Sequence, residues 1–403
     1  MSDYDVYSVR GYYTSLGDGW TYLNAQAAPQ IPERVSAAVA RSFRLSTTPL
    51  TPSGGRGHHA QRPRAGALEG EGFVQQARVA VADLVGGTAD CVVLGPSLEV
   101  LYDNLARSLE PMLRRNSSVV LSGLDSERPS VPFARLGAEV RWAQPDLGTG
   151  ELPGWQYREL VDGSTRLVAL SAAHGVLGTL ADVKTISDNT RSRSRAWVLA
   201  DASEYAPHRL VDIEEMDVDI LGVDLARLGG PQVAALVFRH PLMFKRLRNP
   251  ELIASPVSPG LAGAVSATVD HYAALVEKRG SRRVRLTASF AALEAYLKEL
   301  GDDLHTFLGS LPAVHILGVT GEAAAGANSD RLPRLSFAVN GVPADTVQQR
   351  LFDNGIVTSL APSSQLLTDM GVDDIGGAVT VGLGPFNTSH DVEHLVRVVA
   401  SLA

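Results

Sequence analysis

Cysteine is almost absent from this chain, which has only Cys91 among its 403 residues. A single cysteine cannot form an internal disulfide, and such scarcity is typical of a reducing compartment. Basic residues are also outnumbered, since the formal net charge is -8. Nucleic-acid phosphates and acidic membranes attract the opposite sign of charge. We therefore expect no nucleic-acid partner and no general affinity for acidic membranes.

Long apolar runs are missing as well. No stretch approaches the roughly 18 apolar residues that would cross a bilayer. The N-terminal MSDYDVYSVR lacks the apolar core of a signal peptide. Aromatic residues make up only 6% of the chain, but a hydrophobic share of 45% is enough for a sizeable core. We expect a cytoplasmic globular protein, and its length suggests more than one domain.

Several ligand-binding motifs are absent. There is no GxxxxGK[ST] loop and no GxGxxG after an expected strand, so sites of the ATP and NAD types have little support. The C-terminal HDVEH places His390 and His394 beside Glu393, as in inverted zinc-protease motifs. The chain continues for only nine residues without a further acidic ligand, which favours a solvated terminal helix. We predict no metal site.

The middle of the chain repeats a pattern of short, apolar segments of β type separated by segments of helical length. Residues 98–114 and 182–195 are expected helices of this kind. The expected strands are 91–95, 119–124, 139–143, 166–172, 197–202, 219–223 and 234–238. This alternation predicts an α/β fold with a mostly parallel sheet, in which ligands gather at the carboxyl ends of the strands.

The pattern changes from Pro256 onward. The sequence predicts one long helix over 258–279 and then a mixed segment. Helices are expected near 288–309, 344–353 and 390–402, and strands near 313–318, 334–339 and 378–383. We therefore predict a large α/β domain over 26–284 and a smaller α+β domain built from 1–25 and 285–403.

One stretch, 198–239, carries the most chemical information. Asp201 stands at the end of an apolar strand, and a second strand runs into Arg227 and a Gly-Gly-Pro turn. Taken alone, an acid at a strand end is more often a cap or turn residue than a catalytic group. The surrounding pattern changes that balance.

This stretch resembles the class V aminotransferases, a family that includes the cysteine desulfurases and holds pyridoxal phosphate (PLP). The resemblance runs without a gap over 198–239 and extends to 22–35, 92–109, 167–180 and 382–396. It implies the fold of PLP-dependent transferases of fold type I, the aspartate aminotransferase-like fold, and a homodimer. A small amino-acid-like ligand is the implied substrate class.

The resemblance also assigns positions around the cofactor ring. Asp201 matches the acid that binds the pyridine nitrogen and makes the ring an electron sink. Arg227 stands at the position of the Schiff-base lysine, and a guanidinium stays protonated and cannot form the usual aldimine. Lys245, the nearest lysine, lies beyond the next expected strand. Ser126 replaces the stacking histidine, and Glu204 replaces a ring-contacting histidine or glutamine.

Further positions depart from the family pattern. Glu99 and Asp224 stand where hydroxyl groups bind the phosphate, and carboxylates repel a phosphate dianion. At the substrate side, Gly175 replaces an asparagine and Thr380 replaces the arginine that binds the substrate carboxylate. The desulfurase nucleophile is also missing, because Cys91 falls on an expected core strand.

Three hypotheses remain open from the sequence. The first is a degenerate family member, unable to form the aldimine, that acts as a binding or regulatory protein. The second is an active PLP-dependent aminotransferase-type enzyme with non-standard cofactor attachment. The third is a different enzyme that uses Glu99, Glu204, Asp224 and Arg227 as an acid–base cluster, although a structural ion-pair network has the same appearance.

Overall fold

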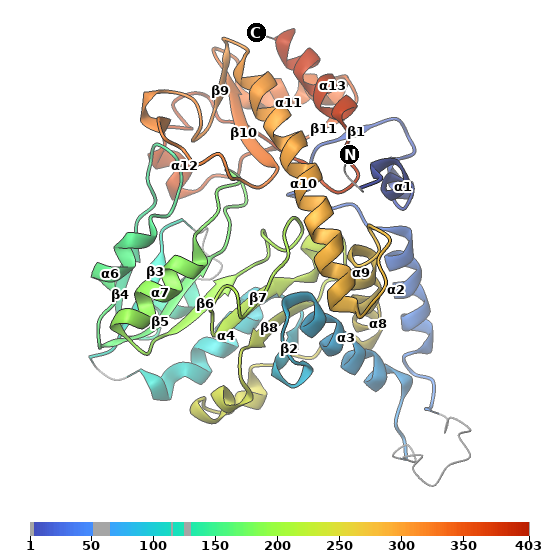
Figure 1. Ribbon diagram of the computed structural model, residues 1–403, viewed down its shortest axis with the longest axis vertical. Coiled ribbons are helices and arrows are strands. Elements are labelled where there is room, and N and C mark those ends of the chain that lie inside the picture. The colour runs from blue at the N-terminus through green and yellow to red at the C-terminus, as the bar shows by residue number, and fades with distance from the viewer. Residues whose placement is uncertain (1–3, 51–64, 114–115, 125–129, 403) are drawn as a thin grey trace.

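The computed structural model describes residues 4–50, 65–113, 116–124 and 130–402. A large sheet with its helices forms one end of the molecule, and a smaller sheet forms the other (Figure 1). The chain's two described ends both lie near the smaller sheet, so the N-terminal segment joins the C-terminal part in space. The division into domains at 26–284 remains a prediction, and α10 (Arg282–Gly309) runs from one end to the other.

The large sheet has seven strands in the order β2-β8-β7-β6-β5-β3-β4. Their bounds are β2 Val92–Gly95, β3 Ser118–Ser122, β4 Glu139–Ala143, β5 Thr165–Ser171, β6 Trp197–Asp201, β7 Ile220–Asp224 and β8 Ala234–Phe238. Five of them, β3 to β7, are mutually parallel, whereas β8 runs antiparallel to both of its neighbours. The predicted mostly parallel α/β sheet is confirmed.

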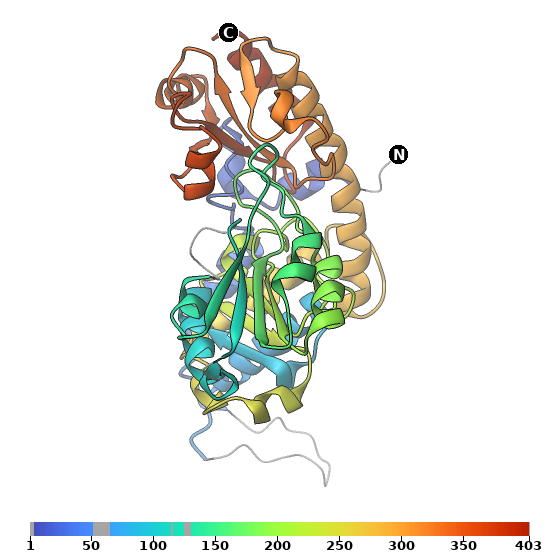
Figure 2. The same ribbon diagram turned by 90° about the vertical axis from the view of Figure 1, so that its left-hand side faces the viewer.

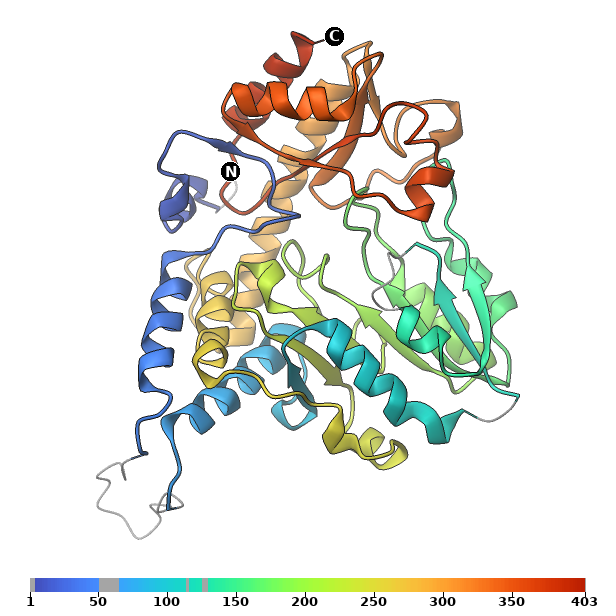
Figure 3. The ribbon, with the colours of Figure 1, turned by 180° about the vertical axis from the view of Figure 1, so that it is seen from behind.

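Alternate residues of each strand face opposite sides of this sheet, and both sides are buried. In β3, for example, Val120 packs into one hydrophobic cluster while Val119 and Leu121 pack into the other. Figure 3 shows α4 (Leu98–Leu109) lying across one face. Its apolar residues join the second cluster, and those of α3 (Glu69–Val85) join the first.

The remaining helices around the large sheet are mostly short. They are α2 Glu33–Leu45, α5 Val131–Ala134, α6 Tyr157–Leu160, α7 Val183–Arg193, α8 Pro259–Ala262 and α9 Val265–Tyr272. The prediction of a single helix over 258–279 was wrong, because this segment forms two helices, α8 and α9, separated at Gly263–Ala264. A Cβ at Gly263 would lie 2.1 Å from the Ser42 Oγ of α2, so the glycine permits a close approach of the two segments.

The smaller sheet has four antiparallel strands in the order β12-β13-β10-β9. Its elements are β9 Val314–Ile316, β10 Arg334–Val339, α11 Ala344–Asp353, β12 Ser359–Leu360, α12 Gln365–Asp369, β13 Val379–Gly382 and α13 Ser389–Ala400. A two-stranded pair, β1 Thr21–Tyr22 with β11 Ile356–Val357, ties the N-terminal segment and α1 Val6–Arg10 to this part. The smaller sheet lies beyond one end of the large sheet's strands (Figure 2). No helix among the described residues is long and apolar enough to cross a membrane.

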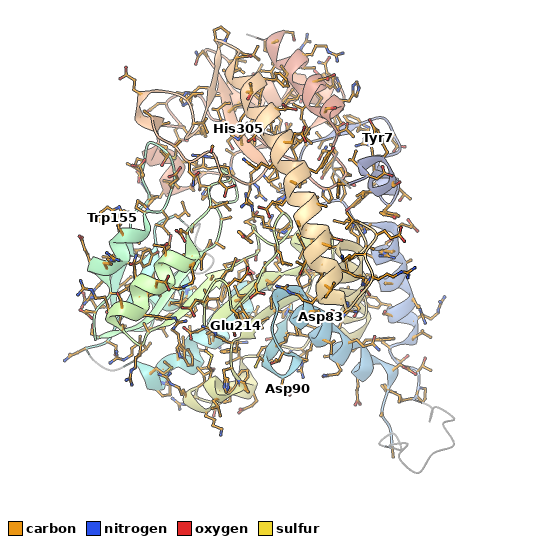
Figure 4. All side chains as sticks on the ribbon, in the orientation of Figure 1. Tyr7, Asp83, Asp90, Trp155, Glu214 and His305 are labelled. Atoms are coloured by element: carbon orange, nitrogen blue, oxygen red, sulfur yellow. The ribbon has the colours of Figure 1, made fainter. Side chains whose placement is uncertain are left out.

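Helix α10 begins at Arg282, six residues before the predicted start at 288. Ser281 caps it by accepting a hydrogen bond from the Val284 N–H. Arg282 lies 2.8 Å from Asp83 of α3, which Figure 4 places beside the lower end of α10. Arg283 similarly lies 2.7 Å from Asp212. These pairs anchor the start of α10 to α3 and to the segment between β6 and β7.

Cys91 is fully buried, but it ends a short 3-10 turn, Ala89–Cys91, directly before β2 instead of lying on the strand. Ser126 lies outside the described residues.

Candidate functional site

A cavity of about 370 Å³ lies between the carboxyl ends of the large sheet and the β12–β13 edge of the smaller sheet. Ser171 and Asp201, the last residues of β5 and β6, line one side, and Ser359 and Thr380 line the other. This is the location expected for a ligand in an open α/β sheet. The other lining residues are Gln26, Ala27, Ala173, His174, Gly175, Val176, Ser203, Glu204, Arg227, Leu360, Pro362, Ser363 and Ser364.

Arg227 reaches this cavity from a short 3-10 helix, Leu225–Leu228, which follows β7. Asp224 caps that helix by accepting a hydrogen bond from the Ala226 N–H at 3.0 Å. One guanidinium nitrogen, Nη1, donates to the Gln26 carbonyl at 2.6 Å. The other, Nη2, lies 3.2 Å from Glu204 Oε1. The Arg227 head group is therefore held on two sides.

Glu204 is shared between two arginines. Its second oxygen, Oε2, accepts a hydrogen bond from Arg334 Nη1 at 2.6 Å. The Arg334 side chain is only 1% exposed, and it also donates to the Gly175 carbonyl at 3.0 Å and lies 2.8 Å from His208 Nε2. Because arginine only donates, His208 Nε2 must accept. Burial holds the pKa of His208 well below its usual range, so this ring stays neutral beside the guanidinium.

His174 lies at the turn after β5. Its Nδ1 accepts hydrogen bonds from the backbone N–H groups of Val176 and Leu177, at 3.3 and 3.1 Å. Burial lowers the pKa of His174 to about 4. The ring is therefore neutral at pH 7, and its proton is on Nε2, which makes this nitrogen a donor.

Asp201 and Ser203 form the floor on the β6 side. Both are buried, with exposed fractions of 5% and 2%. The Ser203 N–H donates to Asp201 Oδ1 at 2.9 Å, which fixes the carboxylate at the strand end. The Ser203 hydroxyl itself has no hydrogen-bond partner among the described residues.

Of the residues singled out from the sequence, the cavity brings together Asp201, Glu204, Arg227, Gly175 and Thr380. Two others do not line the cavity. Glu99 lies in the first turn of α4, and Asp224 caps the 3-10 helix that follows β7. Ser126 lies outside the described residues.

Other cavity residues were not predicted. His174 had a weak local signal, since it directly precedes Gly175 in the turn that follows an expected strand. Arg334 follows a proline at the start of an ordinary strand, and no sequence pattern connects it with Glu204, 130 positions away. Gln26 and Ser203 likewise became recognisable only when the fold brought them together.

Lysines are few in this chain. The chain has four, and all four are exposed: Lys184, Lys245, Lys278 and Lys298. None of them lines the cavity. The nearest in sequence to Arg227, Lys245, lies in the short helix Pro241–Arg246 beyond β8. No lysine amine of this chain is therefore available inside the cavity.

Comparison with known proteins gives consistent relationships. Residues 21–248 match the family described as aminotransferase class-V. An uncharacterised protein of Mycobacterium tuberculosis is 39% identical over 99% of both chains. A probable cysteine desulfurase of Pseudomonas putida is 22% identical over 93% of this chain and 91% of its own.

Solved structures agree in fold. The apo cysteine desulfurase of Thermococcus onnurineus has a TM-score of 0.80 at 18% identity, covering 98% of this chain and 97% of its own. A cysteine desulfurase of Escherichia coli has a TM-score of 0.76 at 19% identity, covering 99% and 98%. These structures confirm the predicted fold of PLP-dependent transferases. The family match over more than half of the chain, together with the mycobacterial relative, shows that this chain belongs to the class V aminotransferase family.

Proposed function

We propose that this protein is a degenerate member of its family, which does not hold PLP as a lysine adduct and acts as a binding or regulatory protein. Members of the family use PLP. The observation that carries the proposal is that Arg227 lines the cavity and that Gln26 and Glu204 hold its guanidinium. By the resemblance, this is the position of the Schiff-base lysine. A guanidinium that stays protonated cannot attack the cofactor aldehyde.

The residues present do not fit the cofactor in a second respect. By the resemblance, the phosphate would lie near the start of α4 and the end of β7, where Glu99 and Asp224 stand. A carboxylate about 4 Å from a phosphate charge costs about 4 kcal/mol per pair of unit charges at an effective dielectric near 20. The dipole at the start of α4 offsets only about 0.3–1 kcal/mol of this. The residues at these two positions therefore do not suit a phosphate group.

The rival hypothesis is an active transferase with another mode of attachment. By the resemblance, Asp201 matches the acid that would bind a pyridine nitrogen, and Asp201 lines the cavity. The four exposed lysines offer no substitute for the missing amine within one chain. We also propose that the protein is a homodimer, because its resemblance to the family implies one.

Isothermal titration of the purified protein with PLP tests the proposal. We expect no saturable heat at one site per chain. The variant carrying both Glu99→Ser and Asp224→Ser is the informative comparison, because it removes the two repelling carboxylates and is expected to bind PLP more tightly than the unaltered protein. Tight stoichiometric binding to the unaltered protein would contradict the proposal.

A further inference from the structure

Arg227 presents hydrogen-bond donors to the cavity that the protein does not use. Among the described residues, its guanidinium makes one hydrogen bond, to the Gln26 carbonyl, and one ion pair, with Glu204. A guanidinium carries more N–H groups than these two contacts occupy. The Arg227 side chain lines the cavity and is 24% exposed, so a ligand can reach it. Its remaining N–H groups are therefore available to an acceptor inside the cavity.

The His174 ring supplies a second donor. Its Nδ1 accepts from the backbone N–H groups of Val176 and Leu177, so the ring proton is on Nε2. His174 lines the cavity and is 8% exposed. Its Nε2 has no hydrogen-bond partner among the described residues, and it is not one of the polar atoms that are buried without a partner. This N–H is therefore open to a ligand.

The carboxylates that line the cavity are already bound by the protein. Glu204 Oε1 lies 3.2 Å from Arg227, and Oε2 lies 2.6 Å from Arg334. Asp201 accepts a hydrogen bond from the Ser203 N–H at 2.9 Å. A ligand ammonium group would have to compete with these donors. A ligand group that accepts hydrogen bonds has no such competitor.

The charge and the apolar part of the wall narrow the ligand further. Hydrogen bonds from a guanidinium to a carboxylate are stronger than those to a neutral acceptor. A phosphate dianion would be repelled more strongly than a carboxylate by Asp201 and Glu204. Val176, Leu360 and Pro362 line the same cavity and offer apolar contact. A single carboxylate with a short apolar tail matches both parts of the wall.

We infer that this cavity binds a small monocarboxylate that has an apolar tail and no ammonium group. Its carboxylate accepts from the guanidinium of Arg227 and from His174 Nε2, and its tail contacts Leu360. By the resemblance, family members bind the substrate carboxylate through an arginine at the position of Thr380, so the anchor in this chain is a different one. The inference rests on the proposed function, because it requires a cavity that no lysine-bound cofactor fills.

Ligand-observed saturation-transfer NMR with 4-methylpentanoate tests the inference. Two related probes are L-leucine, which is the same acid with an added amino group, and 4-methylpentanamide, which is its uncharged amide. We expect 4-methylpentanoate to give a saturable signal that inorganic phosphate does not displace. It should bind about fivefold or more tightly than either related probe. No saturable signal, or equally tight binding of L-leucine, overturns the inference.

Arg227→Gln should weaken the binding of 4-methylpentanoate about tenfold, because it removes charge-assisted hydrogen bonds. Arg141→Gln is the matched control. Arg141 also donates to a backbone carbonyl, that of Leu160 at 2.8 Å, and pairs with a carboxylate, that of Asp162. Its side chain is 21% exposed, but it lies on β4 and does not line the cavity. Equal binding by the two variants overturns the inference.

His174→Asn tests the second donor and serves if Arg227→Gln does not fold. The asparagine oxygen can still accept from the Val176 and Leu177 N–H groups, but the ring N–H is lost. We expect about fivefold weaker binding of 4-methylpentanoate, as for the loss of one hydrogen bond. Unchanged binding overturns the inference. A reducible PLP–lysine adduct overturns the proposed function instead, so the two failures are distinguishable.

Discussion

The guanidinium of Arg227 lies 3.2 Å from one oxygen of Glu204, and Arg334 binds the other oxygen at 2.6 Å. One carboxylate thus holds two arginines that come from different sheets. Arg227 follows β7 of the large sheet, and Arg334 begins β10 of the smaller one. This three-residue bridge fixes the two sheets relative to each other across the cavity and keeps Arg227 turned into its wall.

Removing the shared charge should destabilise the protein. Glu204→Gln leaves Arg334, which is 1% exposed, without its carboxylate partner. Breaking one side of a buried ion pair typically costs 3–5 kcal/mol, so we expect a loss of about 3 kcal/mol in the free energy of unfolding. Urea denaturation measures this change.

The matched control for Glu204→Gln is Glu110→Gln. Glu110 pairs with Arg248 at 2.7 Å, but both side chains are more than half exposed. An exposed pair contributes about 1 kcal/mol or less. Equal losses in the free energy of unfolding from the two substitutions would show that the bridge through Glu204 does not fix the two sheets relative to each other.

Stability should fall in acid because of His174. Burial lowers its pKa in the folded protein to about 4, whereas the unfolded chain titrates near the ordinary value of 6.5. Between these values the unfolded state binds more protons than the folded state. The contribution of His174 to the free energy of unfolding is therefore complete above pH 6.5 and declines toward pH 4. This group alone accounts for about 3 kcal/mol at the acid end of that range.

The variant His174→Asn isolates the effect. An asparagine oxygen can still accept from the Val176 and Leu177 N–H groups, but it does not titrate. Thermal unfolding measured from pH 7 to pH 4 should show a shallower decline for this variant. A decline as steep as that of the unaltered protein would mean that other buried groups control the acid sensitivity.

Gly229 should tolerate no side chain. It has a φ of +69°, and a Cβ there would lie 2.4 Å from the Gln30 carbonyl oxygen. Gly341 has a similar φ of +76°, but a Cβ there meets nothing within 4 Å. Gly341→Ala should therefore cost only the backbone penalty, about 1 kcal/mol. Gly229→Ala should cost clearly more, and equal melting temperatures would contradict the expected clash.

Restoring the amine alone should not restore cofactor binding. We expect Arg227→Lys to form little reducible PLP adduct, because Glu99 and Asp224 still repel the phosphate. The same substitution combined with Glu99→Ser and Asp224→Ser should form substantially more adduct, measured by intact-protein mass after borohydride reduction. A full adduct in the single variant would show that the two carboxylates do not oppose the phosphate.

Much of the fold could be predicted from local pattern. The strands ending at Ser171 and Asp201 have continuous apolar runs, which are typical of a sheet buried on both faces. The break between α8 and α9 was missed because Gly263 is tolerated in a helix, and only its contact with Ser42 reveals the close packing.

The site could be predicted only in part. Asp201 and Arg227 lie in one ungapped segment that resembles the family, so their proximity followed from the resemblance. Arg334 and Gln26 reach the cavity from distant parts of the chain, and nothing local distinguishes them from other polar residues. The hydrogen-bond assignment at His174 depends on atomic geometry that no sequence pattern contains.

The most direct test of the central claim is to incubate the purified protein with PLP, reduce it with borohydride and map modified lysines by mass spectrometry. We predict no stoichiometric adduct at any of the four lysines, only low and scattered labelling of these exposed amines. A stoichiometric adduct at one lysine would contradict the account. It would show that an amine reaches the cavity and restore the hypothesis of an active transferase.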